Sequence, residues 1–109
     1  MGNDPLTQPD TQPDDVLLLE PKVKAKRPPM FKVIMHNDDF TPMDFVVEML
    51  KTIFRLPHED AVSVMLQIHH QGIGLCGIFT RDVAETKIDM VLSAARDEGH
   101  PLQCTLEQE

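Results

Sequence analysis

The residues best suited to chemistry stand together in one short polar loop. Asn37, Asp38 and Asp39 follow an apolar segment, with His36 in front of them, and a helix-like pattern comes next. A pair of carboxylates can receive an ammonium group, and together with a histidine it can bind a metal ion. Asn and Asp are also typical of turns, and an acid near a helix N-terminus offsets the helix dipole. The residue types alone leave a cation site and a plain turn both open.

Two adjacent histidines close a later helix-like segment. His69 and His70 point about 100° apart on a helix, so they cannot both face one site. Met65 and Ile68 lie in the neighbourhood of His69 through their spacing along the helix. One histidine can therefore stand at the rim of an apolar patch, although an ordinary surface or core histidine fits the same pattern. No HExxH motif and no paired His and Cys ligands occur, so no metal site is predicted.

Signatures of nucleophilic and nucleotide chemistry are absent from the sequence. It contains no GxSxG, no P-loop and no GxGxxG motif. An enzyme would have to work by acid–base or metal chemistry from His36, Asp38, Asp39 and His69, and metal content would reveal the metal-dependent form. We predict that the chain is not an enzyme and needs no cofactor.

Charge and composition exclude several partners. The chain has 109 residues, enough for one small domain, and 10 Lys and Arg against 18 Asp and Glu give a net charge of −8. An acidic chain lacks the positive surface that phosphates need, which argues against nucleic acid and anionic membranes. No apolar run is long enough to span a bilayer and no signal sequence begins the chain. We expect a cytoplasmic monomer with Cys76 and Cys104 reduced.

Residues 1–29 differ in composition from the rest, because six of the nine prolines fall there. Proline fixes φ and removes an amide donor, so this stretch favours neither a strand ladder nor a long helix. We predict a mobile N-terminal extension over residues 1–29 and a folded domain over residues 30–109. The one apolar cluster of the extension, residues 16–19, either touches the domain or docks to a partner.

Hydrophobic periodicity predicts the order β-α-α-β-α-β for the domain. Strands are expected near residues 31–35, 72–79 and 102–106, and helices near residues 42–55, 57–71 and 81–98. Thr41 is predicted to cap the first helix, with Asp44 completing a capping box, and Thr80 to cap the third. The predicted fold class is α+β: an antiparallel or mixed three-stranded sheet covered on one face by three amphipathic helices.

Several separated motifs resemble one family, the Clp protease adaptors called ClpS. They agree in order and spacing over roughly residues 28–107: NDDFTPM at 37–43, His69 with Gln71 and Gly72, VAETK at 83–87, GHPL at 99–102 and CTL at 104–106. The resemblance implies an adaptor that binds proteins starting with Leu, Phe, Tyr or Trp. It delivers them to the AAA+ unfoldase ClpA, which feeds the ClpP peptidase.

The same resemblance implies roles for particular residues. Asn37, Asp38 and His69 would hold the α-amino group and first peptide unit of the substrate, while Thr41 and Asp39 shape the loop. The implied apolar pocket consists of Met43, Val46, Met65, Ile68 and Leu102, with Met43 as a gate against β-branched residues. Asp82, Glu85 and Lys87 match the region that meets the N-terminal domain of ClpA.

Binding energies fit such a role. Charge-assisted hydrogen bonds to an ammonium group contribute about 1.5–3 kcal/mol each, and burial of a Leu or Phe side chain contributes about as much. After the cost of ordering the peptide, a micromolar dissociation constant, about −8 kcal/mol, is expected. The alternative in a different class is a protein-interaction module without selectivity for the N-terminal residue.

Overall fold

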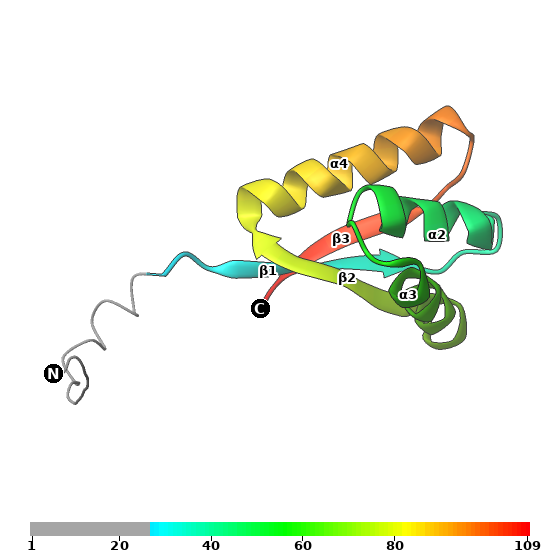
Figure 1. The fold of residues 1–109 in the computed structure, drawn as a ribbon. Helices are drawn as coiled ribbons and strands as arrows, with labels where there is room; N and C mark the ends of the chain where they lie inside the picture. The colour runs from blue at the N-terminus through cyan, green and yellow to red at the C-terminus, as the bar shows by residue number, and fades with distance from the viewer. Residues whose placement is uncertain (1–26) are drawn as a thin grey trace, which may run out of the picture.

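The computed structural model describes residues 27–109, which form the predicted α+β fold (Figure 1). A three-stranded sheet carries helices on one side, in the expected order of elements. The elements are β1 (Met30–His36), α2 (Met43–Thr52), α3 (His58–Gln71), β2 (Ile73–Thr80), α4 (Arg81–Asp97) and β3 (Gln103–Gln108). Residues 1–26, which hold most of the predicted extension and its apolar cluster, lie outside the described residues.

The sheet is antiparallel throughout, with β1 in the middle between β2 and β3. His36 at the end of β1 pairs with Ile73 at the start of β2 and with Gln103 at the start of β3. The ladder between β1 and β2 shifts register after Val33, where Cys76 is the extra residue. Such a bulge lets one strand bend without breaking the pairing.

The helices bury their apolar stripes against one face of the sheet. Helix α4 contacts all three strands, α2 contacts α3, and α3 packs on β2 (Figure 1). Helix α2 is amphipathic as predicted, because Val46, Met49, Leu50 and Ile53 recur at helical spacing and are all buried. Helix α4 is amphipathic too, since it buries Ala84, Ile88, Val91 and Ala95 and half-buries Leu92.

The predicted cap of the first helix is wrong. Helix α2 begins at Met43, Pro42 holds the cap position, and no side chain caps that end. The Thr41 hydroxyl donates instead to Asp38 Oδ2 at 2.7 Å. Thr80 does occupy the cap position of α4, but without a hydrogen bond from its side chain. The capping pattern therefore predicted the start of the helix to within two residues, but the Thr41 hydroxyl bonds to Asp38 in the loop and not to the helix.

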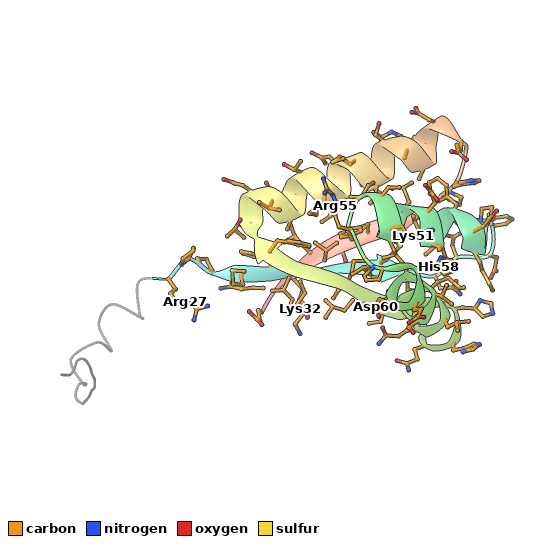
Figure 2. The ribbon with its side chains drawn as sticks, viewed as in Figure 1. Arg27, Lys32, Lys51, Arg55, His58 and Asp60 are labelled. Atoms are coloured by element: carbon orange, nitrogen blue, oxygen red, sulfur yellow. The ribbon has the colours of Figure 1, made fainter. Side chains whose placement is uncertain are left out.

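Turns at the helix ends use left-handed backbone. Helix α3 stops at Gly72, whose φ of 92° suits a residue without Cβ, as its position after the helix predicts. Arg55 has a φ of 61° in the turn from α2 to α3, a strained conformation for a residue with a side chain (Figure 2). The carbonyl of Leu50 accepts from the Leu56 N–H at 3.1 Å and closes this turn.

The cysteines behave as buried core residues. Cys76 and Cys104 are both free thiols in the cluster of apolar side chains between sheet and helices. Hydrogen bonding to Cys104 and burial raise the pKa of Cys76 well above its usual range, so this thiol stays protonated. Among residues 27–109, no helix is long and apolar enough to cross a bilayer.

Candidate functional site

The sheet topology brings several residues that were predicted to bind the substrate peptide to one end of the domain. Strand β1 ends there, and β2 and β3 begin there. Three connections consequently meet at this end: the loop of residues 37–42, the C-terminus of α3 before β2, and residues 98–102 before β3. They carry Asn37, Asp38, Asp39 and Thr41, then His69, and then Leu102.

A backbone hydrogen bond fastens two of these connections. The N–H of Asn37 donates to the carbonyl oxygen of Gly72 at 2.9 Å. The Gly72 N–H in turn donates to the carbonyl of Ile68 at 2.9 Å, which closes the last turn of α3. The loop and the helix end that carries His69 are thereby held together. The Asn37 and His69 side chains are both exposed at this junction.

Asp38 organises the loop. Its Oδ1 accepts from the N–H groups of Phe40 at 2.8 Å and Thr41 at 2.7 Å, and its Oδ2 accepts from the Thr41 hydroxyl. Partial burial disfavours the carboxylate, but the bonds from the Thr41 hydroxyl and the two N–H groups, with nearby His100, outweigh it. The pKa of Asp38 lies below its usual value, so the group is an anion at neutral pH.

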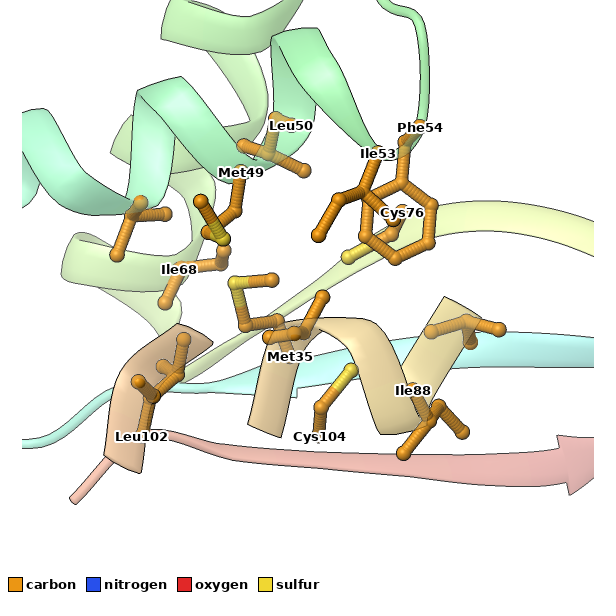
Figure 3. Packing of buried hydrophobic residues seen from close by; sticks show 14 of the residues in the cluster. Met35, Met49, Leu50, Ile53, Phe54, Ile68, Cys76, Ile88, Leu102 and Cys104 are labelled. Atoms are coloured by element: carbon orange, nitrogen blue, oxygen red, sulfur yellow. The ribbon is translucent and has the colours of Figure 1, made fainter. Parts of the chain in front are cut away.

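The apolar site residues come from three elements and differ in exposure. Val46 on α2, Ile68 on α3 and Leu102 before β3 belong to one buried cluster and are only 6%, 3% and 5% exposed. Figure 3 shows Ile68 and Leu102 at one end of this cluster, away from Phe54 and Cys76. Met65 packs against the cluster half-buried, whereas Met43 is 43% exposed. The two methionines therefore present most of the accessible surface.

A neighbouring feature escaped the sequence analysis. The ring of His100 stands edge-on to Phe45 with centroids 4.7 Å apart, and its Nε2 lies 3.6 Å from Glu98 Oε1. These residues border a hollow of about 520 Å³ together with Pro42, Asp44 and Glu48. The sequence marked His100 only as part of a motif, because its nearness to Asp38 depends on how β3 returns to the sheet.

The three predicted unfoldase contacts all lie on α4 and border two different hollows. Asp82 and Lys87 line a hollow of about 240 Å³ on α4 with Val83, Thr86 and Met90. Glu85 pairs with Arg81 at 2.9 Å and lines a different hollow, beside β3. Lys87 also works inside the domain, because its Nζ donates to the carbonyl oxygen of Ile53 at 2.7 Å.

The metal-dependent alternative finds no support in the arrangement of side chains. Within residues 27–109, no group of three or more His, Cys, Asp or Glu residues is placed to hold a metal ion. His36 points across the sheet, where its Nε2 lies 2.8 Å from the Thr105 hydroxyl. The donor set His36, Asp38, Asp39 and His69 is therefore not assembled around one point.

Comparison with known proteins identifies relatives over most of the chain. Residues 26–105 match the family described as ATP-dependent Clp protease adaptor protein ClpS. The chain is 48% identical over 100 residues to the ClpS adapter of Rhodospirillum centenum, covering 92% of this chain and 93% of the relative. It is 52% identical over 94 residues to the adapter of Nitrosospira multiformis, covering 86% and 92%.

A solved structure agrees with the fold. The structure of Agrobacterium tumefaciens ClpS2 bound to L-phenylalaninamide superposes with a TM-score of 0.74 at 37% sequence identity. The match covers 76% of this chain and all of that protein. The bound molecule in that structure is an amino acid amide with a free amino group and a bulky apolar side chain.

Proposed function

The chain belongs to the ClpS family of Clp protease adaptors, and we propose that it captures proteins by their first residue and delivers them to a ClpA-type unfoldase. Its ligands are chains that begin with Leu, Phe, Tyr or Trp and carry a free α-amino group. As an adaptor it presents substrates to a protease and performs no reaction itself. The observation that carries the proposal is the ionised, loop-bound Asp38 at the end of the sheet where buried Ile68 and Leu102 lie, with Met65 packed on their cluster and Met43 exposed.

The amino group of the substrate finds its partner in Asp38. A carboxylate offers about four acceptor positions, and three hydrogen bonds from the loop leave one of them for a ligand. The ligand is a cation, and the neighbouring Asp39, Asp44 and Glu48 make this end of the domain acidic. Asn37 and His69 add exposed acceptors beside the loop, and the Asn37–Gly72 bond keeps them close. An internal peptide bond carries no such cation and is rejected.

The first side chain of the substrate enters between the methionines. Val46, Ile68 and Leu102 form the floor, and their low exposure means that a ligand reaches them only when the side chains above them move, Met65 among them. Methionine suits this task because it is unbranched and flexible. Burial of a Leu- or Phe-sized group there contributes about 1.5–3 kcal/mol.

The unfoldase docks on α4. Asp82 and Lys87 border a hollow with two exposed apolar residues, Val83 and Met90, which are 43% and 51% exposed. A mixed charged and apolar surface is typical of a specific protein contact. Glu85, one turn after Asp82, pairs with Arg81 and joins the contact at its edge.

Two further parts of the proposal concern the rest of the molecule. The N-terminal extension over residues 1–29 serves the hand-over to the unfoldase, and the domain over residues 30–109 serves capture. Two reduced, buried cysteines suit a cytoplasmic protein.

A titration with matched peptides tests the function. Fluorescence anisotropy compares labelled peptides that differ only in residue one, each with a free and an acetylated N-terminus. We expect micromolar binding for Leu and Phe, none for Ser, and loss of binding on acetylation, which removes the charge. Equal affinity for all first residues would instead support the module without N-terminal selectivity.

A further inference from the structure

Helix α3 and strand β2 approach most closely at Gly74. A Cβ placed on this glycine would lie 2.5 Å from Ile68 Cγ1, 3.3 Å from Ile68 Cδ1 and 3.2 Å from the carbonyl oxygen of Val64. Gly72 provides the contrast: its φ is 92°, but nothing lies within 4 Å of a Cβ there. Glycine at position 74 is therefore required by lack of space, and glycine at position 72 by backbone conformation.

The space at Gly74 is filled by Ile68. Two of the three atoms nearest to the missing Cβ belong to this side chain, and Ile68 is only 3% exposed. The isoleucine consequently lies back against the strand. As a β-branched residue on a helix it has one strongly preferred rotamer, which keeps it in this position as long as residue 74 leaves the space.

The helix itself cannot easily move away from an added carbon. Its C-terminal turn is fixed by the Gly72 N–H, which donates to the carbonyl oxygen of Ile68, and the Gly72 carbonyl accepts from the Asn37 N–H of the loop. The carbonyl of Val64, one turn earlier, also faces Gly74. A methyl group at position 74 is accommodated mainly by pushing the Ile68 side chain off the strand, toward the apolar pocket proposed above.

We propose that Gly74 is a specificity-determining position, which sets the depth of the pocket for the first substrate residue by giving Ile68 room to lie back. The inference rests on the proposed function. Gly74 acts only through Ile68 and is a positioning residue. Its absent side chain favours the larger ligands, Phe and Trp, over Leu.

Peptide selectivity of Gly74→Ala tests this role. A shallower pocket should weaken binding of a Phe-initiated peptide about tenfold more than binding of a Leu-initiated one, as expected for one methyl group in an apolar site. Ile68→Val removes a methyl group and should shift the ratio the opposite way. The double variant should return toward the ratio of the unmodified chain.

A second glycine of the same strand supplies the control. A Cβ at Gly77 would also be crowded, at 2.6 Å from Phe79 Cζ, but its neighbour lies toward the opposite end of β2. Gly77→Ala should lower the melting temperature measured by circular dichroism without changing the ratio of the two affinities. An equal change of ratio in both variants would mean general loosening and would overturn the proposal.

The remaining outcomes separate the inference from the function. If the unmodified chain binds both peptides and Gly74→Ala leaves their ratio unchanged, the role of Gly74 is refuted while the function stands. If the unmodified chain binds neither peptide, the proposed function fails and the inference fails with it. If Gly74→Ala does not fold, the double variant is compared with Ile68→Val instead. Adding Gly74→Ala to Ile68→Val must then shift the ratio of the two affinities toward the Leu-initiated peptide. An unchanged ratio between these two variants refutes the role of Gly74.

Discussion

Asp38 and Thr41 hold each other at two places: the Thr41 N–H donates to Oδ1 and its hydroxyl donates to Oδ2 of the same carboxylate, both at 2.7 Å. Threonine thus serves the loop, and the aspartate is ionised and fixed before any ligand arrives. A preorganised acceptor loses little freedom on binding, which favours recognition of a small group such as an amine.

The ionised state of Asp38 makes stability depend on pH. Its pKa is lower in the folded than in the unfolded chain, where about 3.9 is usual. The stabilisation is therefore complete above pH 5 and is lost as the pH falls through 3.9 to the lower folded value. We expect Asp38→Asn to reduce the free energy of unfolding by about 1 kcal/mol at pH 7 and by much less at acidic pH.

Urea unfolding followed by circular dichroism measures this difference, since the chain has no Trp or Tyr. Asp39→Asn is the matched control, because Asp39 is the exposed neighbour in the same loop. A constant difference between Asp38→Asn and the unmodified chain from pH 7 to pH 3 would contradict the prediction.

We expect Lys87 to stabilise the folded domain, apart from any role in contact with a partner. Its Nζ donates to Ile53 at the end of α2 and lies 5.9 Å and 5.3 Å from the ring centroids of Phe54 and Phe79. We expect Lys87→Met to lower the free energy of unfolding by about 2 kcal/mol. Lys51→Met, at an exposed lysine in the last turn of α2, should change it little (Figure 2). Melting temperatures of both variants test this prediction. An unchanged melting temperature for Lys87→Met would mean that Lys87 does not stabilise the domain and serves contact with a partner instead.

Met43 should control which side chains enter. At 43% exposure its side chain is free to change position. In the proposed pocket, a β-branched first residue would place a methyl group against it. We expect Met43→Ala to admit Ile- and Val-initiated peptides with at least about a tenfold gain in affinity. Met90→Ala, at a similarly exposed methionine on α4, should leave the selectivity as it was. A peptide array with varied first residues reports both.

Binding should follow the charge of the substrate's amine. A free α-amino group titrates at about 7.7–8.0 and is an ammonium only below that range. The affinity for a Phe-initiated peptide should therefore be full below about pH 7 and fall by about tenfold per pH unit above pH 8. Anisotropy titrations up to pH 10, with circular dichroism to verify the fold, measure it. A flat profile counts against the ammonium site.

The extension should act in delivery and not in capture. A truncated chain that starts at Pro28 keeps β1 and every site residue. We expect it to bind peptides with unchanged affinity but to fail in degradation of a Phe-initiated protein by an unfoldase and its peptidase. Gel assays of substrate turnover, run beside the peptide titration, separate the two effects. Loss of peptide binding would show that the domain boundary is wrong.

The order of helices and strands could be predicted from the sequence because most of these elements repeat apolar residues at the spacing of a helix or a strand. Helix α2 shows this best, with Val46, Met49, Leu50 and Ile53 all buried as their spacing indicates. The cap at Thr41 failed because a second local pattern competed with it. Asp38 stands only three residues before Thr41, and its carboxylate accepts both the N–H and the hydroxyl of Thr41 within the loop.

Local sequence patterns could not predict which distant segments come together at the site. Because β1 lies between β2 and β3, the Asn37 loop meets the end of α3 and the segment before Leu102. Strand order and the bulge at Cys76 depend on packing across the whole sheet. The resemblance to a family named the residues, whereas the strand order explains why residues so distant in sequence can act together.

The central position of β1 also has a mechanical consequence. The chain enters the domain at Met30, and β1 is bonded along its length to a neighbour on each side. A force pulling on the N-terminus runs parallel to this strand and loads both ladders at once, so many hydrogen bonds must rupture together. The domain should therefore resist unfolding by a force applied at its N-terminus. An edge strand, which is bonded to one neighbour only, would separate more easily.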